Sequence, residues 1–540
     1  MLPQERLDQA LRSIGKVDLV VVGAGIYGAA IAYEATSRGL TAVLLDKGDF
    51  GAGASSNSLR IIHGGLRYLQ SLNLSRARKS AMERSVLLRI FPGLIQPMKF
   101  AVMLGGSLKR SPPVMAAGLT LNALLTADRN HNLPKDSRIR AGGLTTGPKL
   151  GRACPHLMEG AKGTAAYWYD GLLLDPDRAL TEMIWVAKAA GAAVLNYTEV
   201  VKYLETGGQI RGVLVRDSVN GHETEIEARV VMDCTGAGLV RNGLWAEEFR
   251  RLGQVGYIRA INLVVDCPLS NLGVGAWSLR GRYLFAVPTG DKVSIGTWYL
   301  PLKEKDGPPR VSEAERAAML QEIRETFPGR PDFSDAICSQ QIGVLPCHAD
   351  DLAAPDPQPI PAPVVLRGEQ MGGPVGLWVV QGEKWTTARY MADRVVTEMA
   401  ARHNFPIKPS ASADTVLVEK SCPGLADADD GGFGHAKKRL ELRRGLAAGE
   451  IFRKAMSHPE ASRVVSGRTD VYRSEVEFAL ANEDIVKLSD LARRLGIGQL
   501  ARLYEKSLTD LVEMAAKVKN WDETEQRLQL EDYTLDPRWS

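Results

Sequence analysis

The chain has 540 residues, of which 45% are hydrophobic and 24% charged, and its formal net charge is +4. This length indicates two or three domains of a globular protein, and so small a charge gives no reason to expect nucleic-acid binding. The six cysteines are scattered, without a CxxC pair or clustered histidines, which argues against a metal site or a disulfide framework and fits a reducing compartment.

A glycine-rich turn near the start is the most specific local signal. Residues 17–46 predict a strand, a turn, a helix and a second strand that ends in the carboxylate of Asp46. In this pattern Gly23 allows the tight turn, Gly25 lets the backbone approach a pyrophosphate, and Gly28 lets helix and strand pack closely. The phosphates would bind at the positive end of the helix, with Asp46 on ribose hydroxyls. The pattern predicts a dinucleotide site and leaves NAD and FAD open.

No apolar stretch reaches the roughly 20 residues of a membrane span, and residues 1–16 are polar, without the apolar core of a signal peptide. The nearest candidate is the run at 114–126, for which a buried helix is the favoured interpretation. The alternative is a surface helix that dips into a bilayer, with Lys109 and Arg110 near anionic headgroups. That arrangement would suit an enzyme that passes electrons to a lipid-soluble quinone.

The remaining elements follow from periodicity and from turn residues. A loop is predicted at 51–65, helices at 74–90 and 180–190, and strands at 193–195, 213–215 and 230–236, the last returning to the first sheet as a buried parallel strand. Alternating strands over 256–299 predict a mainly antiparallel second layer, followed by a proline-rich spacer at 353–363. A strand at 377–382 and a helix containing 386–398 precede helical periodicity at 476–495 and 500–518.

Several segments, in chain order, resemble one family, the FAD-dependent glycerol-3-phosphate dehydrogenases. The most specific is Ile62-His-Gly-Gly-Leu-Arg-Tyr68, which follows Ser55-Ser-Asn-Ser58 and resembles the family's flavin-contacting loop. Further similar segments are DPDR at 175–178, DCTG at 233–236, GVLP at 343–346, GEKWTT at 382–387, and the stretch 475–496 with its LARRL sequence.

The resemblance implies an α/β fold with three parts. These are a discontinuous FAD-binding Rossmann-like domain of the glutathione-reductase type, an interleaved and mainly antiparallel substrate domain, and a C-terminal α-helical domain. The expected boundaries are 17–100 with 150–255 and 365–405 for the first domain, 101–149 with 256–364 for the second, and 410–540 for the third.

The resemblance also implies FAD rather than NAD as the cofactor. Serine hydroxyls can donate to its phosphate oxygens, and Lys384 with the helix start at Thr386 would stabilise an anionic reduced flavin. His63 is expected to position backbone or flavin rather than to act as a base. The implied cofactor-binding residues are Gly23, Gly25, Ile26, Tyr27, Gly28, Asp46, Lys47, Ser55, Ser56, Ser58, His63, Gly64, Gly65, Leu66, Val200, Thr235, Gly236, Gly382, Lys384, Trp385 and Thr386.

The substrate side of the resemblance is less complete. Asn262 stands where the family has a histidine, and an amide takes up no proton at neutral pH. Leu345 stands where the family has an arginine, so one positive charge is lost at this position. Arg259 could restore one positive charge. Arg67 is the expected anion anchor. The implied catalytic and substrate-binding residues are Arg67, Tyr68, Arg259, Asn262, Arg367 and Lys384.

The favoured function is an FAD-dependent dehydrogenase that oxidises glycerol 3-phosphate or a related polyol phosphate, by hydride transfer to flavin N5, and passes the electrons to a quinone. The alternatives are an oxidase or dehydrogenase of a hydroxy acid or amine, and a catalytically altered flavin-binding homologue. We expect an anionic alcohol as substrate, no metal, and a cytoplasmic protein with peripheral contact at the inner face of the membrane. Whether the protein forms a homodimer is an open question at this stage.

Overall fold

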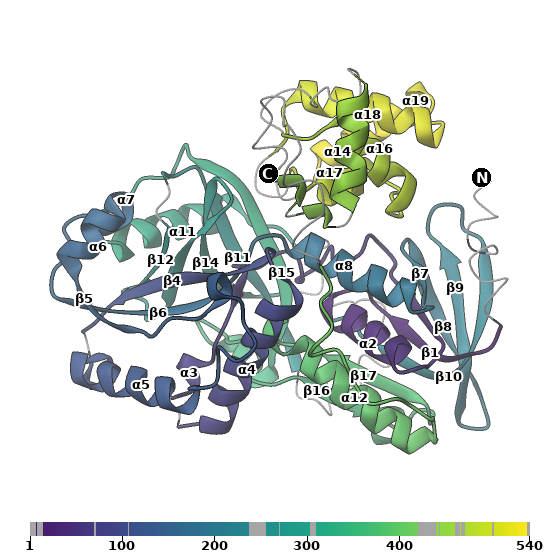
Figure 1. The fold of residues 1–540 in the computed structure, drawn as a ribbon, viewed down its shortest axis with the longest axis horizontal. Coiled ribbons are helices and arrows are strands. Elements are labelled where there is room, and N and C mark those ends of the chain that lie inside the picture. The colour runs from purple at the N-terminus through teal and green to yellow at the C-terminus, as the bar shows by residue number, and fades with distance from the viewer. Residues whose placement is uncertain are drawn as a thin grey trace.

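Two β-sheets and a group of C-terminal helices make up the structure, a computed structural model of the chain (Figure 1). It describes residues 7, 15–69, 72–105, 107–236, 255–268, 271–302, 309–418, 439–441, 443–445, 447–458, 465, 470–498 and 502–536. Most of the polar segment at 1–16 therefore lies outside the described residues. So do the side chains of Arg67 and Lys109, although the helical turns that contain them are described.

The first sheet has the strand order β16-β17-β10-β1-β2-β7, with β8 and β9 attached to β10. β17, β10, β1, β2 and β7 run parallel, and β16 is antiparallel to β17. The parallel strands are almost continuously apolar because both faces of the sheet are covered, one by helices and the other by β8 and β9. The strands are β1 (Val17–Val22), β2 (Ala42–Leu45), β7 (Ala193–Leu195), β8 (Thr198–Thr206), β9 (Gln209–Asp217), β10 (Glu223–Asp233), β16 (Val364–Arg367) and β17 (Leu377–Gln381).

Helix α2 (Ile26–Ser37) occupies the centre of the first layer and packs between α8 (Pro176–Ala189) and α12 (Ala388–His403). All its residues except Ser37 are buried, so its small side chains fit the helix closely between its neighbours. Together these helices and one face of the sheet form the largest apolar core. The predicted strand–turn–helix–strand unit, the helix at 180–190 and the return of the 230–236 strand to the first sheet are confirmed.

The second sheet has the order β15-β11-β14-β13-β12-β4-β6-β3, with β5 beside β6. All its pairings are antiparallel except β12 with β4, in agreement with the predicted mainly antiparallel layer. The strands are β3 (Ile61–Ile62), β4 (Ile95–Met103), β5 (Gly143–Thr146), β6 (Thr164–Leu173), β11 (Val255–Val265), β12 (Leu272–Trp277), β13 (Tyr283–Thr289), β14 (Lys292–Pro301) and β15 (Ile337–His348).

Strands β4 and β6 show where the sequence boundaries differ from the sheets. Most of β4 and all of β6 were expected in the cofactor domain, but they pair with each other over nine residues each, and β4 also pairs with β12. The second sheet thus includes two segments that the sequence had assigned mostly or wholly to the cofactor domain. A hydrophobic pattern shows that a strand is half-buried, and it does not show which sheet the strand joins.

Helix α5 (Pro112–Leu125) departs from the favoured interpretation of a buried helix. Leu119 is its only buried residue, while Leu124 is 72% exposed and Val114 is 45% exposed. The helix lies along the outer side of the second sheet, next to α3 (Leu66–Leu69) and α4 (Leu74–Ile90) (Figure 1). It is a surface helix, while the bilayer contact of the alternative interpretation stays a prediction. Among the described residues, no helix is long and apolar enough to cross a bilayer.

The C-terminal helices form a separate apolar core and lie above the two sheets in Figure 1. They are α14 (Ala447–Ser457), α16 (Arg473–Asn482), α17 (Leu488–Leu495), α18 (Glu505–Lys519) and α19 (Glu523–Thr534). The periodicity at 476–495 predicted one helix, but the chain breaks it into α16 and α17, with Asp484 at φ 46° between them.

The remaining helices are short or flank the second sheet. They are η1 (Leu108–Arg110), η2 (Lys135–Ser137), α6 (Gly147–Ala153), α7 (Pro155–Met158), α11 (Glu313–Thr326), η3 (Ala349–Ala353), η4 (Gly368–Met371) and η5 (Trp385–Thr387).

Candidate cofactor site

The glycine turn between β1 and α2 is as close-packed as its sequence predicts. Gly23 has φ 96°, and a Cβ atom there would lie 2.8 Å from the carbonyl oxygen of Cys234, which follows β10. A Cβ atom on Gly28 would lie 1.8 Å from the carbonyl oxygen of Gly23. Both positions therefore require glycine, the first for its backbone conformation and its close approach to β10, the second for the contact of helix and turn.

Asp46 follows β2 and faces the same turn. Its Oδ2 accepts a hydrogen bond of 2.7 Å from the backbone N–H of Ala24, and its Oδ1 accepts one of 3.0 Å from that of Gly48. Burial raises the pKa of this carboxyl to about 6, although the two N–H donors act in the opposite direction. Asp46 is thus held rigidly at the end of the strand, where a ribose hydroxyl would add a further donor.

A cavity of about 480 Å³ opens at the carboxyl ends of β1, β2, β10 and β17. This is the edge at which open α/β sheets bind ligands. Of the residues implied by the resemblance, the cavity is lined by Gly23, Gly25, Ile26, Tyr27, Asp46, Lys47, Ser55, Thr235, Gly236, Gly382, Lys384 and Trp385. Leu345 also lines it, with its neighbours Val344 and Pro346.

The loop after β17 joins the wall of this cavity to the HGGLRY segment. The ammonium of Lys384 is hydrogen-bonded to the Tyr68 hydroxyl and lies 4.7 Å from the centre of the Tyr68 ring. Trp385 donates from Nε1 to the backbone oxygen of Ser55, 2.7 Å away. The neighbouring Glu383 carboxylate accepts from Arg76 at 2.7 Å. Three segments distant in the sequence therefore meet at one side of the cavity.

His63 and the two glycines after it are arranged around a buried carboxylate, Asp170 of β6. Asp170 accepts a 2.7 Å hydrogen bond from the backbone N–H of Gly64 and one of the same length from Arg84, and its Oδ2 is 3.7 Å from Nδ1 of His63. Burial acts to raise the pKa of Asp170, but the interactions with His63 and Arg84 outweigh it and lower that pKa. The His63 side chain remains 48% exposed.

Several other residues implied by the resemblance lie away from the cavity lining. The Ser56 hydroxyl donates to the backbone oxygen of Gly51 and is bonded to Asp177, and the Ser58 hydroxyl accepts from the backbone of Arg60. These two hydroxyls thus bind within the loop and to α8, and their contact with FAD stays a prediction. The others outside the lining are Gly28, His63, Gly64, Gly65, Leu66, Val200 and Thr386.

Two of the three expected substrate arginines, Arg259 and Arg367, are engaged elsewhere, and the side chain of Arg67 lies outside the described residues. Arg259 donates to the carboxylate of Glu315 in α11 at 2.7 Å, so its charge is neutralised on the outer side of the second sheet. Arg367 pairs with Glu398 of α12 at 3.1 Å. Asn262 is buried and accepts a 2.8 Å hydrogen bond from the Thr297 hydroxyl. None of these three is among the cavity-lining residues, and Tyr68 adjoins the lining through its hydrogen bond with Lys384.

Sequence reasoning missed two groups of residues at the site. The wall also contains Gly48, Asp49, Gly51, Ala52, Gly53, Ala54, Cys234, Pro309, Ile342, Val344, Pro346, Val380, Gln381 and Glu383. Most of them belong to segments that the sequence analysis had singled out, and their proximity in sequence to residues such as Asp46 and Lys384 could have identified them. The second group is Asp170 with Arg84, which had no local signal because one lies on β6 and the other on α4, whereas their neighbours His63 and Gly64 were among the implied residues.

The comparison with protein families agrees with this geometry. The family described as "DAO: FAD dependent oxidoreductase" matches residues 18–398. The chain belongs to the FAD-dependent oxidoreductase family. The match covers both sheets and ends within α12, before the C-terminal helices.

Relatives and solved structures extend the likeness to the C-terminal helices. Glycerol-3-phosphate dehydrogenase 1 of Mycobacterium tuberculosis is 29% identical over 516 residues, covering 92% of this chain and 94% of that protein. Glycerol-3-phosphate dehydrogenase of Synechocystis is 28% identical over 503 residues, covering 88% of each. The crystal structure of glycerol-3-phosphate dehydrogenase from Bacillus halodurans, complexed with FAD, superposes with a TM-score of 0.72 at 20% identity, covering 100% of this chain and 98% of that one.

The residues of this oxidoreductase fit FAD as the dinucleotide. The turn at Gly23 leaves backbone instead of side chains at the start of α2, where the helix dipole favours a pyrophosphate. Asp46 and Lys384 both line the cavity, where Asp46 would accept from the adenine-side ribose and Lys384, next to Tyr68, would lie near the flavin ring. A cation there would stabilise the negative charge of a reduced flavin ring.

Proposed function

We propose that this FAD-dependent oxidoreductase oxidises the secondary alcohol of a small anionic substrate, with glycerol 3-phosphate as the leading candidate, and delivers the electrons to a quinone. The observation that carries the proposal is the contact of Lys384 with Tyr68 at the cavity wall of an FAD family member. The similarity of nearly the whole chain to glycerol-3-phosphate dehydrogenases supports the same substrate class. The proposal assigns the cofactor to the first sheet and the substrate to the second.

Binding of the anionic end of the substrate falls to the cations near Tyr68. Lys384 is partly exposed and lies 3.8 Å from the Glu383 carboxylate, which pairs more closely with the neighbouring Arg76, at 2.7 Å. Arg67 lies on α3 beside Tyr68 in the sequence and is the second cation of the proposal. When bound, FAD accepts the hydride of the carbinol carbon at N5.

The proton of the substrate hydroxyl needs an acceptor, and we assign this role to His63. Asn262, which stands at the family's histidine position, has no basic atom and is buried beside Thr297. His63 belongs to the segment that supplies Tyr68, and its ring is half-exposed. The carboxylate of Asp170, 3.7 Å from Nδ1, orients the imidazole and stabilises the imidazolium formed by proton uptake. This assignment replaces the expectation that His63 serves only to position backbone or flavin.

Leu345 favours a second candidate, a less strongly charged alcohol or an amine. Its side chain lines the cavity where the resembling family has an arginine. Losing one charged hydrogen-bonding partner costs about 1.5–3 kcal/mol, or roughly 10- to 150-fold in affinity for a phosphate ester.

Anaerobic bleaching of the bound flavin discriminates these candidates. The holoprotein is mixed with glycerol 3-phosphate, other polyol phosphates, 2-hydroxy acids, neutral polyols and amino acids, and the flavin absorbance is followed. We expect polyol phosphates to bleach the flavin fastest. Bleaching by an amino acid, with the flavin left oxidised by every phosphate ester, would show that the substrate class is wrong.

The exposed apolar surface of α5 supports a peripheral contact with a bilayer, where a quinone would be reached. Leu124 and Val114 are exposed on the helix, and Leu108 on the preceding turn is 81% exposed. Apolar side chains at such positions enter the boundary between headgroups and acyl chains. In a flotation assay with vesicles of anionic lipid, Leu124→Glu should reduce binding, whereas the control Leu528→Glu on the exposed face of α19 should not. Equal binding of both variants would remove α5 from the contact.

A further inference from the structure

The loop at residues 48–56 forms one wall of the cofactor cavity although it has no helix or strand of its own. Its inner side is tied to the site, because the Ser55 hydroxyl accepts a 3.0 Å hydrogen bond from the first N–H of α2, that of Ile26. The N–H of Gly51 donates to the backbone oxygen of Ala24 at 3.0 Å. The position of this loop therefore determines the shape of the pyrophosphate end of the cavity.

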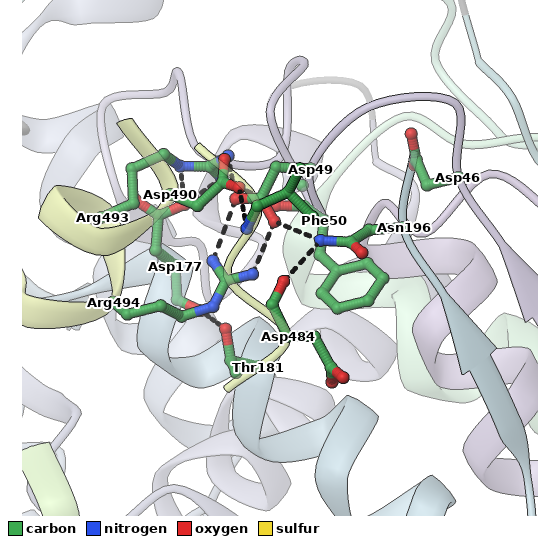
Figure 2. Close-up of polar contacts among 12 residues, drawn as sticks. Asp46, Asp49, Phe50, Asp177, Thr181, Asn196, Asp484, Asp490, Arg493 and Arg494 are labelled. Carbon is green, nitrogen blue, oxygen red and sulfur yellow. Dashed lines mark hydrogen bonds and ion pairs between the residues drawn. The ribbon is translucent and has the colours of Figure 1, made fainter. Parts of the chain in front are cut away.

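The outer side of the same loop is held by two consecutive arginines of the C-terminal helices. Arg494 of α17 donates to both carboxylate oxygens of Asp49, at 2.5 and 3.0 Å. Arg493 donates to Asp49 at 2.8 Å and to the backbone oxygen of Phe50 at 2.7 Å. Figure 2 shows the guanidinium groups converging on Asp49 from α17, with Asp46 of the cofactor site on the neighbouring stretch of chain. A two-oxygen fork of this kind fixes orientation as well as distance.

Asp177, in the first turn of α8, completes the cluster. It accepts from Arg493 at 2.5 Å and is also bonded to the hydroxyl of Ser56 at the end of the loop. Two guanidinium groups and two carboxylates are thus shared among the loop, α8 and α17. We call Asp49, Asp177, Arg493 and Arg494 the loop clamp.

The loop clamp is almost fully buried, so its four side chains depend on one another. The side chains of all four members are at most 7% exposed. Burial would by itself raise the pKa of Asp49, but the charges of Arg494 and Arg493 outweigh it and hold that pKa below its ordinary range. Removing one partner leaves a buried charge uncompensated, so the members favour formation of the cluster as a whole.

The same loop has two binding partners, one on each side. FAD would bind its inner side, and α17 binds its outer side. When two ligands of one segment require the same ordered conformation, the binding of either lowers the ordering cost for the other. Tyr197 adds a parallel connection, since its hydroxyl donates to Asp490 of α17 at 2.8 Å and its backbone N–H donates to the oxygen of Gly48 at 3.0 Å.

We propose that α17 acts as a latch on the cofactor loop: Arg493 and Arg494 are positioning residues for FAD, and docking of the C-terminal helices and binding of FAD strengthen each other. The proposal rests on FAD as the cofactor and is independent of the identity of the substrate. It gives the C-terminal helices, which lie beyond the matched family region, a part in cofactor retention.

The test measures FAD release from purified holoprotein by flavin fluorescence. Arg494→Met should raise the FAD dissociation constant by about 5- to 150-fold, the usual range of coupling between two sites. Arg494→Lys should restore only part of the affinity, because an ammonium group cannot form the two-oxygen fork. The matched control is Arg282→Met, which removes a buried arginine, just before β13, that pairs with Glu322 of α11 and with Asp356. This control should lower thermal stability and leave FAD affinity at its original value. Wild-type FAD affinity in Arg494→Met, or equal loss of FAD in the control, would overturn the proposal.

Hydrogen–deuterium exchange tests the proposal on the wild-type protein, so the result does not depend on whether a variant folds. The wild-type protein is compared before and after removal of its flavin, and again after FAD is restored. We expect FAD to slow exchange in the loop at 48–56 and in α17, with α19 unchanged. Slowing in the loop without any change in α17 would contradict reciprocal coupling, whatever substrate the enzyme uses.

Discussion

The two sides of the cavity differ in what makes them specific. On the cofactor side, specificity comes from backbone: glycines at 23 and 28 that leave no room for a side chain, and a carboxylate fixed by two N–H donors. On the proposed substrate side it would come from side chains, where Leu345 stands in the wall and Arg259 is paired with Glu315. A backbone site tolerates little change and so identifies the cofactor, whereas a side-chain site can change its ligand by a single substitution.

The strongest test of this contrast is Gly28→Ala. A methyl group there would lie 1.8 Å from the carbonyl oxygen of Gly23, a clash well beyond the ~1–3 kcal/mol typical of overpacking. We expect purified protein without flavin and a lower melting temperature. Gly118→Ala is the matched control, because a methyl group on that residue of α5 meets nothing within 4 Å. If Gly28→Ala binds FAD normally, the cofactor side does not depend on backbone packing.

The next largest effect is expected from His63→Asn. Loss of a general base lowers kcat by about 10²- to 10⁴-fold, while the flavin content should stay unchanged because the cavity lining is not altered. His156→Asn, at an exposed position on α7, is the control. Turnover at the original rate in His63→Asn would mean that another group accepts the proton.

Leu345→Arg sharpens the comparison from the substrate side. The new guanidinium should lower KM for a phosphate-bearing substrate by roughly 10- to 150-fold, the equivalent of about 1.5–3 kcal/mol for a charged hydrogen bond. Steady-state kinetics with a neutral polyol provide the control, since its KM should not improve. An equal improvement for both substrates would show that the substitution acts on the cavity shape instead of on charge.

A smaller effect, dependent on pH, is expected at Asp46. Its raised pKa of about 6 means that the carboxyl takes up a proton as the pH falls through 6, and a protonated carboxyl is a poorer acceptor for ribose hydroxyls. The FAD dissociation constant should therefore rise below pH 6, by at most about tenfold per pH unit.

The same raised pKa changes folding stability in the opposite direction: a fall in pH weakens FAD binding but stabilises the folded protein without flavin. The folded, flavin-free protein binds this proton more tightly than the unfolded chain, so the contribution of Asp46 to stability falls as the pH rises from 3.8 to about 6 and then stays constant. Asp46→Asn should flatten both profiles in this window. Profiles that keep their slopes in the variant would assign the titration to another group.

Local sequence signals predicted the elements around the cofactor because those elements are specified locally. The β1–α2–β2 unit, the return of β10 and the strand before Lys384 all combine a clear period with turn residues at their ends. Features that depend on distant partners were missed or wrong. The apolar composition of α5 predicted burial, although the helix has a neighbouring sheet on one side alone, and nothing near Arg259 indicated Glu315 as its partner.

The loop clamp illustrates the same limit. Arg493 and Arg494 are two charges on a short helix, and their sequence is that of an ordinary exposed face. Their partners precede them by more than 300 residues, and pairing over such a separation leaves no periodic trace in the sequence. The resemblance drew attention to this helix without indicating what its arginines contact.

The separation between Asp49 and Arg494 also sets an order of events during synthesis. Asp49 leaves the ribosome among the first tenth of the chain, yet the guanidinium groups that neutralise it follow more than 440 residues later. While the two sheets are being translated, this carboxylate must remain hydrated or pair transiently with another group. Completion of the cofactor wall is therefore a late step of biogenesis, reached only after α17 has emerged.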